Sequence, residues 1–107
     1  MIDIKDLQAI AADRRNIEVS VHTIERLKGR KIKLTDIYNG IDNGMIIEQY
    51  PNVKYYPSCL ILHFRANGKP LHLVCSMGNN KIYFIAVYEP DIKHWNDDFM
   101  TKKEMPK

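Results

Sequence analysis

The apolar residues of this chain change their spacing at Gly44, and this change constrains the fold more than any other feature. Before Gly44 they recur at helical intervals, and after it they alternate or form short runs typical of strands. The pattern predicts helices over 3–15, 21–28 and 36–43, and strands over 45–50, 59–65, 70–76 and 81–88. Helices first and strands afterwards predict an α+β fold, with N-terminal helices packed on one face of an antiparallel sheet.

The length and charge of the chain favour a small intracellular domain. Its 107 residues predict a single domain, 1–107. No apolar run approaches the roughly 18 residues of a membrane helix, and the acidic start is unlike a secretory signal. Both cysteines lie in apolar runs, which favours buried thiols and a cytoplasmic location. The net charge of +3 allows a nucleic-acid partner without requiring one.

The dipeptide Asn67-Gly68 predicts a two-residue type I′ hairpin between the second and third strands. In that register Phe64 faces Leu71, and His63 faces His72. Phe64 and Leu73 are then expected in the core, and both histidines on the opposite face of the sheet, because side chains alternate. The two histidines could be a half-exposed cross-strand pair or, less readily, a pair of metal ligands.

His22 and Arg26 are four residues apart, so they share one face of the predicted helix 21–28. That face lies opposite the apolar stripe of Val21, Ile24 and Leu27. A guanidinium beside an imidazole is suited to holding a phosphate and moving a proton. Ordinary polar surface is the alternative interpretation.

Aromatic and basic residues gather in the loop after the first strand and near the C-terminus. Tyr55, Tyr56 and Lys54 could stack on unpaired bases or could seal a sheet edge. Lys102 and Lys103 form a basic pair that could hold an RNA backbone. These five residues are the candidate nucleic-acid contacts.

Six blocks of the sequence, in order, resemble a bacterial family of small domains of unknown function. They are H-T-x-x-R (22–26), G-M-I-I-E-Q-Y-P (44–51), P-S-C-L-I-L (57–62), K-P-L-H-L-V (69–74), V-Y-E-P-D (87–91) and a late Trp95 with basic residues. The departures from the family pattern are mild: Thr23 for Ala, Leu27 for Met and Ala86 for Thr. The resemblance covers nearly the whole chain from residue 20.

This resemblance implies a function, because members of that family are often encoded beside zinc-finger antitoxins like those that neutralise MqsR. Its plan of helices followed by a sheet is similar to that of the MqsR and RelE class of RNA-cutting toxins. The implied function is a toxin-like RNA endonuclease without a metal or other cofactor, acting on RNA, either free or on the ribosome. The implied protein partner is a zinc-finger antitoxin.

Five polar residues occupy block positions without a role in the predicted core, and they are the candidate catalytic residues: His22, Arg26, Glu48, His72 and Tyr88. Arg26 would stabilise phosphate charge, a histidine would act as acid or base, and Tyr88 would orient the 2′-hydroxyl or donate a proton. Glu48 would act as a base or pair with Arg26. Strict alternation separates Tyr88 from His72, so the two meet only if twist or a bulge re-aims one of them.

A non-catalytic protein-binding module is the alternative function. The segment 45–50 would then be an edge strand that docks a partner, together with Tyr55 and Tyr56.

The spacing of potential ligands predicts a protein without bound zinc. No H-x-H, H-E-x-x-H or C-x-x-C pattern is present, and both cysteines are in apolar runs. Elemental analysis of the purified protein is expected to find far less than one metal ion per chain. A stoichiometric metal would contradict this prediction.

Overall fold

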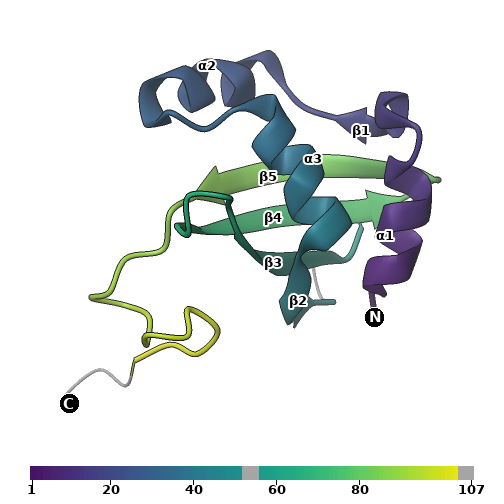
Figure 1. Ribbon diagram of the computed structural model, residues 1–107. Helices are drawn as coiled ribbons and strands as arrows, with labels where there is room; N and C mark the ends of the chain where they lie inside the picture. The colour runs from purple at the N-terminus through teal and green to yellow at the C-terminus, as the bar shows by residue number, and fades with distance from the viewer. Residues whose placement is uncertain (52–55, 104–107) are drawn as a thin grey trace.

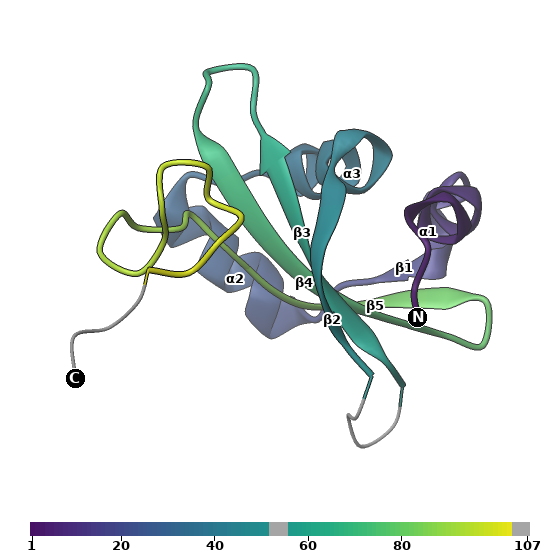
Figure 2. The ribbon, with the colours of Figure 1, turned by 90° about the horizontal axis from the view of Figure 1, so that it is seen from below.

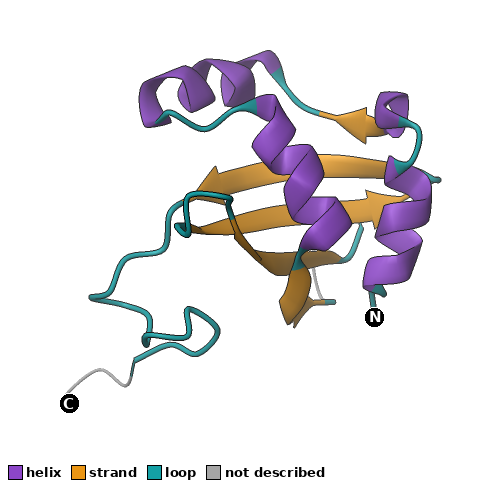
Figure 3. Ribbon diagram, in the orientation of Figure 1, coloured by secondary structure: helices purple, strands orange, loops and turns teal. Residues whose placement is uncertain are grey.

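The computed structural model describes residues 1–51 and 56–103, which form an α+β fold (Figure 1 and Figure 3). The elements, in chain order, are α1 (Ile4–Ala11), a 3₁₀ turn (Arg14–Asn16), β1 (Ile17–Glu18), α2 (Val21–Arg30), α3 (Leu34–Asn43), β2 (Met45–Tyr50), β3 (Ser58–Phe64), β4 (Pro70–Gly78) and β5 (Lys81–Tyr88). None of the described helices has the length and apolarity to cross a bilayer.

α1 and α2 begin at polar caps, and each helix departs from its predicted bounds at one end or both. α1 ends at Ala11, four residues before the predicted end at 15, and a separate 3₁₀ turn follows at Arg14–Asn16. The side chains of Asp3 and Ser20 accept hydrogen bonds from the first turns of α1 and α2. α2 was predicted to end at 28, before Gly29, but it continues to Arg30, and Lys31 ends it in the left-handed conformation with φ of 55°. α3 likewise begins two residues before the predicted start at 36.

The strands form one mixed sheet in the order β1-β5-β4-β3-β2. β2, β3, β4 and β5 pair antiparallel with one another in chain order, as predicted, but β1 pairs with β5 in parallel. The segment at Ile17 therefore becomes an edge strand, where the sequence pattern predicted neither a helix nor a strand. α1 and α3 lie over one face of the sheet, and α2 lies near β5 (Figure 1).

The predicted type I′ turn at Asn67-Gly68 is wrong. The Gly68 N–H donates to the Arg65 carbonyl, the Arg65 N–H donates to the Lys69 carbonyl, and only Gly68 has a positive φ, of 83°. This is a three-residue loop, with a turn followed by a left-handed glycine. The next hairpin instead has the two-residue form, because Asn79 and Asn80 both have positive φ, of 59° and 58°.

The extra loop residue shifts the β3–β4 register by one position and turns the side chains of β3 over. His63 faces Leu71 on the helix-covered side, and Leu62 faces His72 on the reverse face. Phe64 was expected to be buried and is 52% exposed. The faces predicted for β4 are correct: Leu73 is fully buried, and His72 points the other way.

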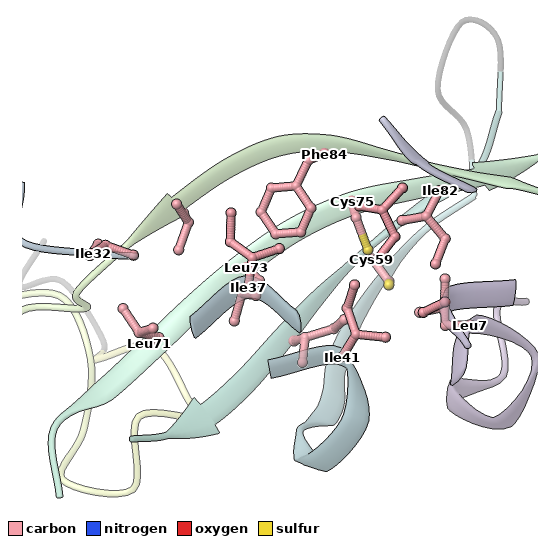
Figure 4. Close-up of a cluster of buried hydrophobic side chains, with 14 of the residues drawn as sticks. Leu7, Ile32, Ile37, Ile41, Cys59, Leu71, Leu73, Cys75, Ile82 and Phe84 are labelled. Carbon is pink, nitrogen blue, oxygen red and sulfur yellow. The ribbon is translucent and has the colours of Figure 1, made fainter. Parts of the chain in front are cut away.

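The main core lies between α3, α1 and the helix-covered face of the sheet (Figure 4). Ile37 and Ile41 of α3 lie over Leu73, and the thiols of Cys59 and Cys75 lie beside them. α3 approaches the sheet closely at Gly40, where a Cβ atom would lie 2.7 Å from the Leu73 Cδ2 atom. A larger residue at position 40 would push the helix away from the sheet.

Two side-chain truncations should distinguish the observed β3–β4 register from the one predicted from the sequence. Leu73→Ala removes fully buried methyl groups and is expected to lower the free energy of unfolding by about 2–5 kcal/mol. Phe64→Ala removes a half-exposed ring and is expected to cost about 1 kcal/mol or less. Urea denaturation measures both, and equal losses would contradict this register.

Candidate functional site

His72 is a fully buried polar residue on the reverse face of the sheet. Its strand neighbours are Leu62 of β3 and Tyr88 of β5. Leu71 and Leu73 on either side of His72 point into the main core, so alternation turns the imidazole away from it.

The C-terminal segment, residues 91–103, packs over His72. It folds back on itself, with Trp95 and Lys102 paired across it, and it lies below the sheet, away from the helices (Figure 1 and Figure 2). The Trp95 ring meets the His72 ring edge-on, with 4.4 Å between centroids, and is itself buried. The buried imidazole is therefore enclosed by a segment without helix or strand.

Two neighbours determine the tautomer of His72. Its Nε2 atom lies 2.8 Å from the carbonyl oxygen of Phe99. Because a carbonyl only accepts hydrogen bonds, Nε2 carries the hydrogen and Nδ1 is left as an acceptor. Nδ1 lies 3.4 Å from the Tyr88 hydroxyl oxygen. At this long distance the phenol can donate a weak hydrogen bond to Nδ1.

A bulge in β5 brings Tyr88 to the face of His72. Cys75 pairs with Phe84, and Val74 pairs with Ala86, so Ile85 is the extra residue. One extra residue reverses the alternation of the strand beyond it. Tyr88 therefore leaves the helix-covered face that strict alternation predicted and becomes the cross-strand partner of His72.

A second bulge does the same for Glu48. Ile46 pairs with Ile61 and Glu48 with Leu60, which leaves Ile47 as the extra residue of β2. Ile46 packs on the main core, whereas Glu48 lies on the reverse face with His72. Two bulges thus put a carboxylate and a phenol on the face that holds the imidazole.

Glu48 interacts with the Tyr50 phenol and with Lys102. The sequence suggested Arg26 as one alternative partner, and among the described residues Glu48 does not pair with it. The Tyr50 hydroxyl donates to Glu48 Oε2 at 3.2 Å, and Lys102 Nζ lies 3.6 Å from Glu48 Oε1. The same ammonium lies 5.8 Å from the centroid of the Trp95 ring, within the range of a cation–π contact. Lys102 therefore links the C-terminal segment to the edge of the site.

Burial sets the protonation states around His72. It lowers the pKa of His72 from its usual 6.5, against the opposing effect of the Phe99 carbonyl. It raises the pKa of Tyr88, with a further contribution from the charge of Glu48. Burial and Glu48 also raise the pKa of Tyr50 to about 12. At neutral pH the site therefore holds a neutral imidazole and protonated phenols.

Arginines from α2 lie along β5 beside this cluster. Arg30 Nη1 donates to the Val87 carbonyl at 2.9 Å, and Arg30 lines a depression of about 410 Å³ with Tyr88 and Glu89. Arg26 shares a smaller depression with Arg30 and residues 85–87. Arg30 was not among the predicted residues, because the helix was expected to end at 28. Its spacing of four from Arg26 is the signal that could have found it.

The other predicted residues are dispersed. His22 is exposed on α2, and among the described residues no hydrogen bond or ion pair joins it or Arg26 to His72. Tyr56 stacks on Tyr83, with 5.6 Å between ring centroids, and Lys103 is exposed beside Lys102.

Two predicted contacts, Lys54 and Tyr55, lie outside the described residues. The expected pairing of His63 with His72 is wrong, since the two point to opposite faces. Within residues 1–51 and 56–103 no three potential ligands lie together as a metal site.

Comparison with known proteins places the chain in a family but not in a functional class. A family model described as a domain of unknown function, DUF4258, matches residues 19–89. No curated protein and no solved structure shows significant similarity to the chain. The matched range contains α2, α3 and β2 to β5, and it excludes the C-terminal segment that covers His72.

The buried neutral state of His72 should make stability depend on pH. Between the usual pKa of 6.5 and the lowered pKa of folded His72, the unfolded chain binds more protons than the folded chain. Stability is then expected to be present above about pH 6.5 and to be lost as the pH falls towards the folded pKa. Chemical denaturation from about pH 7.5 to about pH 5.5 measures this slope.

His72→Gln is expected to flatten the slope, whatever its effect on stability at neutral pH. His63→Gln should also reduce it, because burial lowers the pKa of His63 as well. His22→Gln, at an exposed position, controls for the loss of an imidazole. A slope that His72→Gln leaves unchanged would contradict a buried neutral imidazole.

Proposed function

The chain belongs to the DUF4258 family of domains of unknown function, and we propose that it is a toxin-like RNA endonuclease that works without a metal. One observation carries the proposal: the two bulges bring Glu48 and Tyr88 to the face of His72, beside Lys102. A carboxylate, an imidazole, a phenol and an ammonium group can supply the base and the acid that RNA cleavage needs.

The proposed reaction is attack of a ribose 2′-oxygen on the adjacent phosphorus. A base takes the proton of the 2′-hydroxyl, the bond from phosphorus to O5′ breaks, and an acid gives a proton to O5′. The products are a 2′,3′-cyclic phosphate and a free 5′-hydroxyl. Positive groups beside the phosphate stabilise the charge of the phosphorane.

Tyr88 and His72 form the basic half of the site. The Tyr88 oxygen accepts the proton of the 2′-hydroxyl as its own proton passes to His72 Nδ1. The resulting imidazolium is stabilised by the Phe99 carbonyl at Nε2 and by the nearby charge of Glu48. Because His72 is enclosed, it acts through Tyr88 and does not touch RNA itself.

The acidic half and the phosphate contacts come from exposed cations. Lys102, held beside Glu48, gives its proton to O5′. Arg30 lines the depression at Tyr88, and Arg26 lines the smaller depression that Arg30 shares; the two guanidinium groups bind the phosphate. His22 at the start of α2, the stacked Tyr56 and exposed Lys103 extend the contact to neighbouring nucleotides.

The order of elements also supports this proposal. The helices come before an antiparallel meander of β2 to β5. This is the order of elements in which the sequence resembles the MqsR and RelE toxins. A protein of that type would act in the cytoplasm on RNA, free or on the ribosome, and would be inhibited by a zinc-finger antitoxin.

A protein-binding module remains the second candidate, favoured by the position of β2. Among the described strands it lies at the edge of the sheet, with β3 as its one neighbour, so a partner strand could extend the sheet there.

The proposed chemistry predicts that Tyr88→Phe abolishes cleavage. The change removes one hydroxyl and keeps the ring, so the fold is expected to persist while the rate falls by about 10²-fold or more. The assay follows a labelled RNA, with and without ribosomes, and identifies the ends of the products. Circular dichroism checks the fold.

Tyr83→Phe is the matched control, since Tyr83 is on the same strand and face but away from His72. It is expected to cleave like the parent. If both variants cleave equally, this site is wrong. If the parent neither cuts RNA nor slows bacterial growth, the binding module replaces the nuclease.

A further inference from the structure

The apolar stripe of α2 is only partly covered by the chain itself. Leu27 is 4% exposed, but Val21 and Ile24 are 72% and 39% exposed. Leu34, at the start of α3, is 37% exposed. An amphipathic helix normally buries its stripe against another element, so this part of the surface is open to a partner.

These residues form a groove between the end of α2 and the start of α3. It has a volume of about 520 Å³ and is lined by Ile24, Leu27, Lys28, Lys31, Ile32, Lys33 and Leu34. Leu27 and Ile32 are buried and make its floor, while Ile24 and Leu34 make exposed walls. Ile32 also lines the depression at Tyr88, so the two hollows adjoin, but none of the lining residues of the groove lies on the reverse face with His72.

The charge at the rim of the groove has one sign. Lys28, Lys31 and Lys33 are all exposed, and no ion pair involves them among the described residues. Three ammonium groups around an apolar floor complement a ligand with an apolar ridge and acidic flanks. Because the surface is hollowed, it suits a protruding ridge better than a flat bilayer.

We propose that this groove binds an amphipathic helix of a protein partner, whose apolar ridge fills the groove and whose carboxylates contact the three lysines. Helices dock in grooves through residues spaced three and four apart. The two walls come from different helices, so a single ridge can pack between Ile24 and Leu34. The proposal does not depend on the nuclease function, because it uses none of the residues around His72.

A charge-swap experiment tests this proposal. The probes are two fluorescent synthetic helices, stapled to hold their fold, with the same leucine ridge and either glutamates or lysines on the flanks. Fluorescence anisotropy follows their binding to the full chain. The glutamate helix is expected to bind at least about tenfold more tightly than the lysine helix. Lys28→Glu combined with Lys33→Glu is expected to reverse this preference.

Removal of the apolar walls tests the second half of the proposal. Ile24→Ser and Leu34→Ser are each expected to weaken the glutamate helix about tenfold or more. Ile92→Ser, which removes an exposed isoleucine from the C-terminal segment, is the matched control and should have no effect. Circular dichroism of every variant checks the fold.

Three results would overturn the proposal. One is equal binding of the two helices by the parent, and another is binding that neither serine variant weakens. The third is that single-stranded RNA displaces the helix from the parent chain and does not do so once the lysines are substituted. That result would make the groove an RNA contact. Because Tyr88→Phe leaves the groove intact, failure of the nuclease proposal would not change any of these outcomes.

Discussion

Burial of alternate residues of β4 under the helices is the constraint on which the rest of the structure depends. Leu71, Leu73 and Cys75 are fully buried in the main core, and Gly40 lets α3 approach Leu73 closely. A strand has only two faces, so these contacts force His72 to the reverse side. A polar ring in the centre of the sheet then has to be satisfied there.

On the reverse face, residues that are distant in sequence cover the His72 ring and lie within hydrogen-bonding reach of its nitrogens. Trp95 covers the imidazole, and the Phe99 carbonyl and Tyr88 hydroxyl face its two nitrogens. A buried polar group without partners would cost free energy, on the order of 1–3 kcal/mol. The C-terminal segment therefore has a structural role as well as the proposed functional one.

The bulges are the feature that joins structure to proposed chemistry. Without the extra residue at Ile85, Tyr88 would point into the main core, and without that at Ile47, Glu48 would do the same. A buried carboxylate among apolar side chains would be strongly unfavourable. In each strand the bulge keeps the apolar residue before it, Ile46 or Phe84, on the core side. It moves the polar residues beyond it to the other face, Glu48 and Tyr50 in β2 and Tyr88 in β5.

The sequence by itself determined the order of the three helices and of β2 to β5, though not β1. It also determined the bounds of β2 and β5 and the faces of β4, because the spacing of apolar residues directly reflects which side chains are buried. It also singled out His72, Glu48 and Tyr88 as polar residues without a place in the core. The tertiary structure decided how they meet, since one residue in a hairpin loop or a bulge reverses a face and leaves no trace in the pattern. It likewise decided the contact of Trp95 with His72 and the position of Arg30 beside Tyr88, because long-range packing, and not local spacing, creates both.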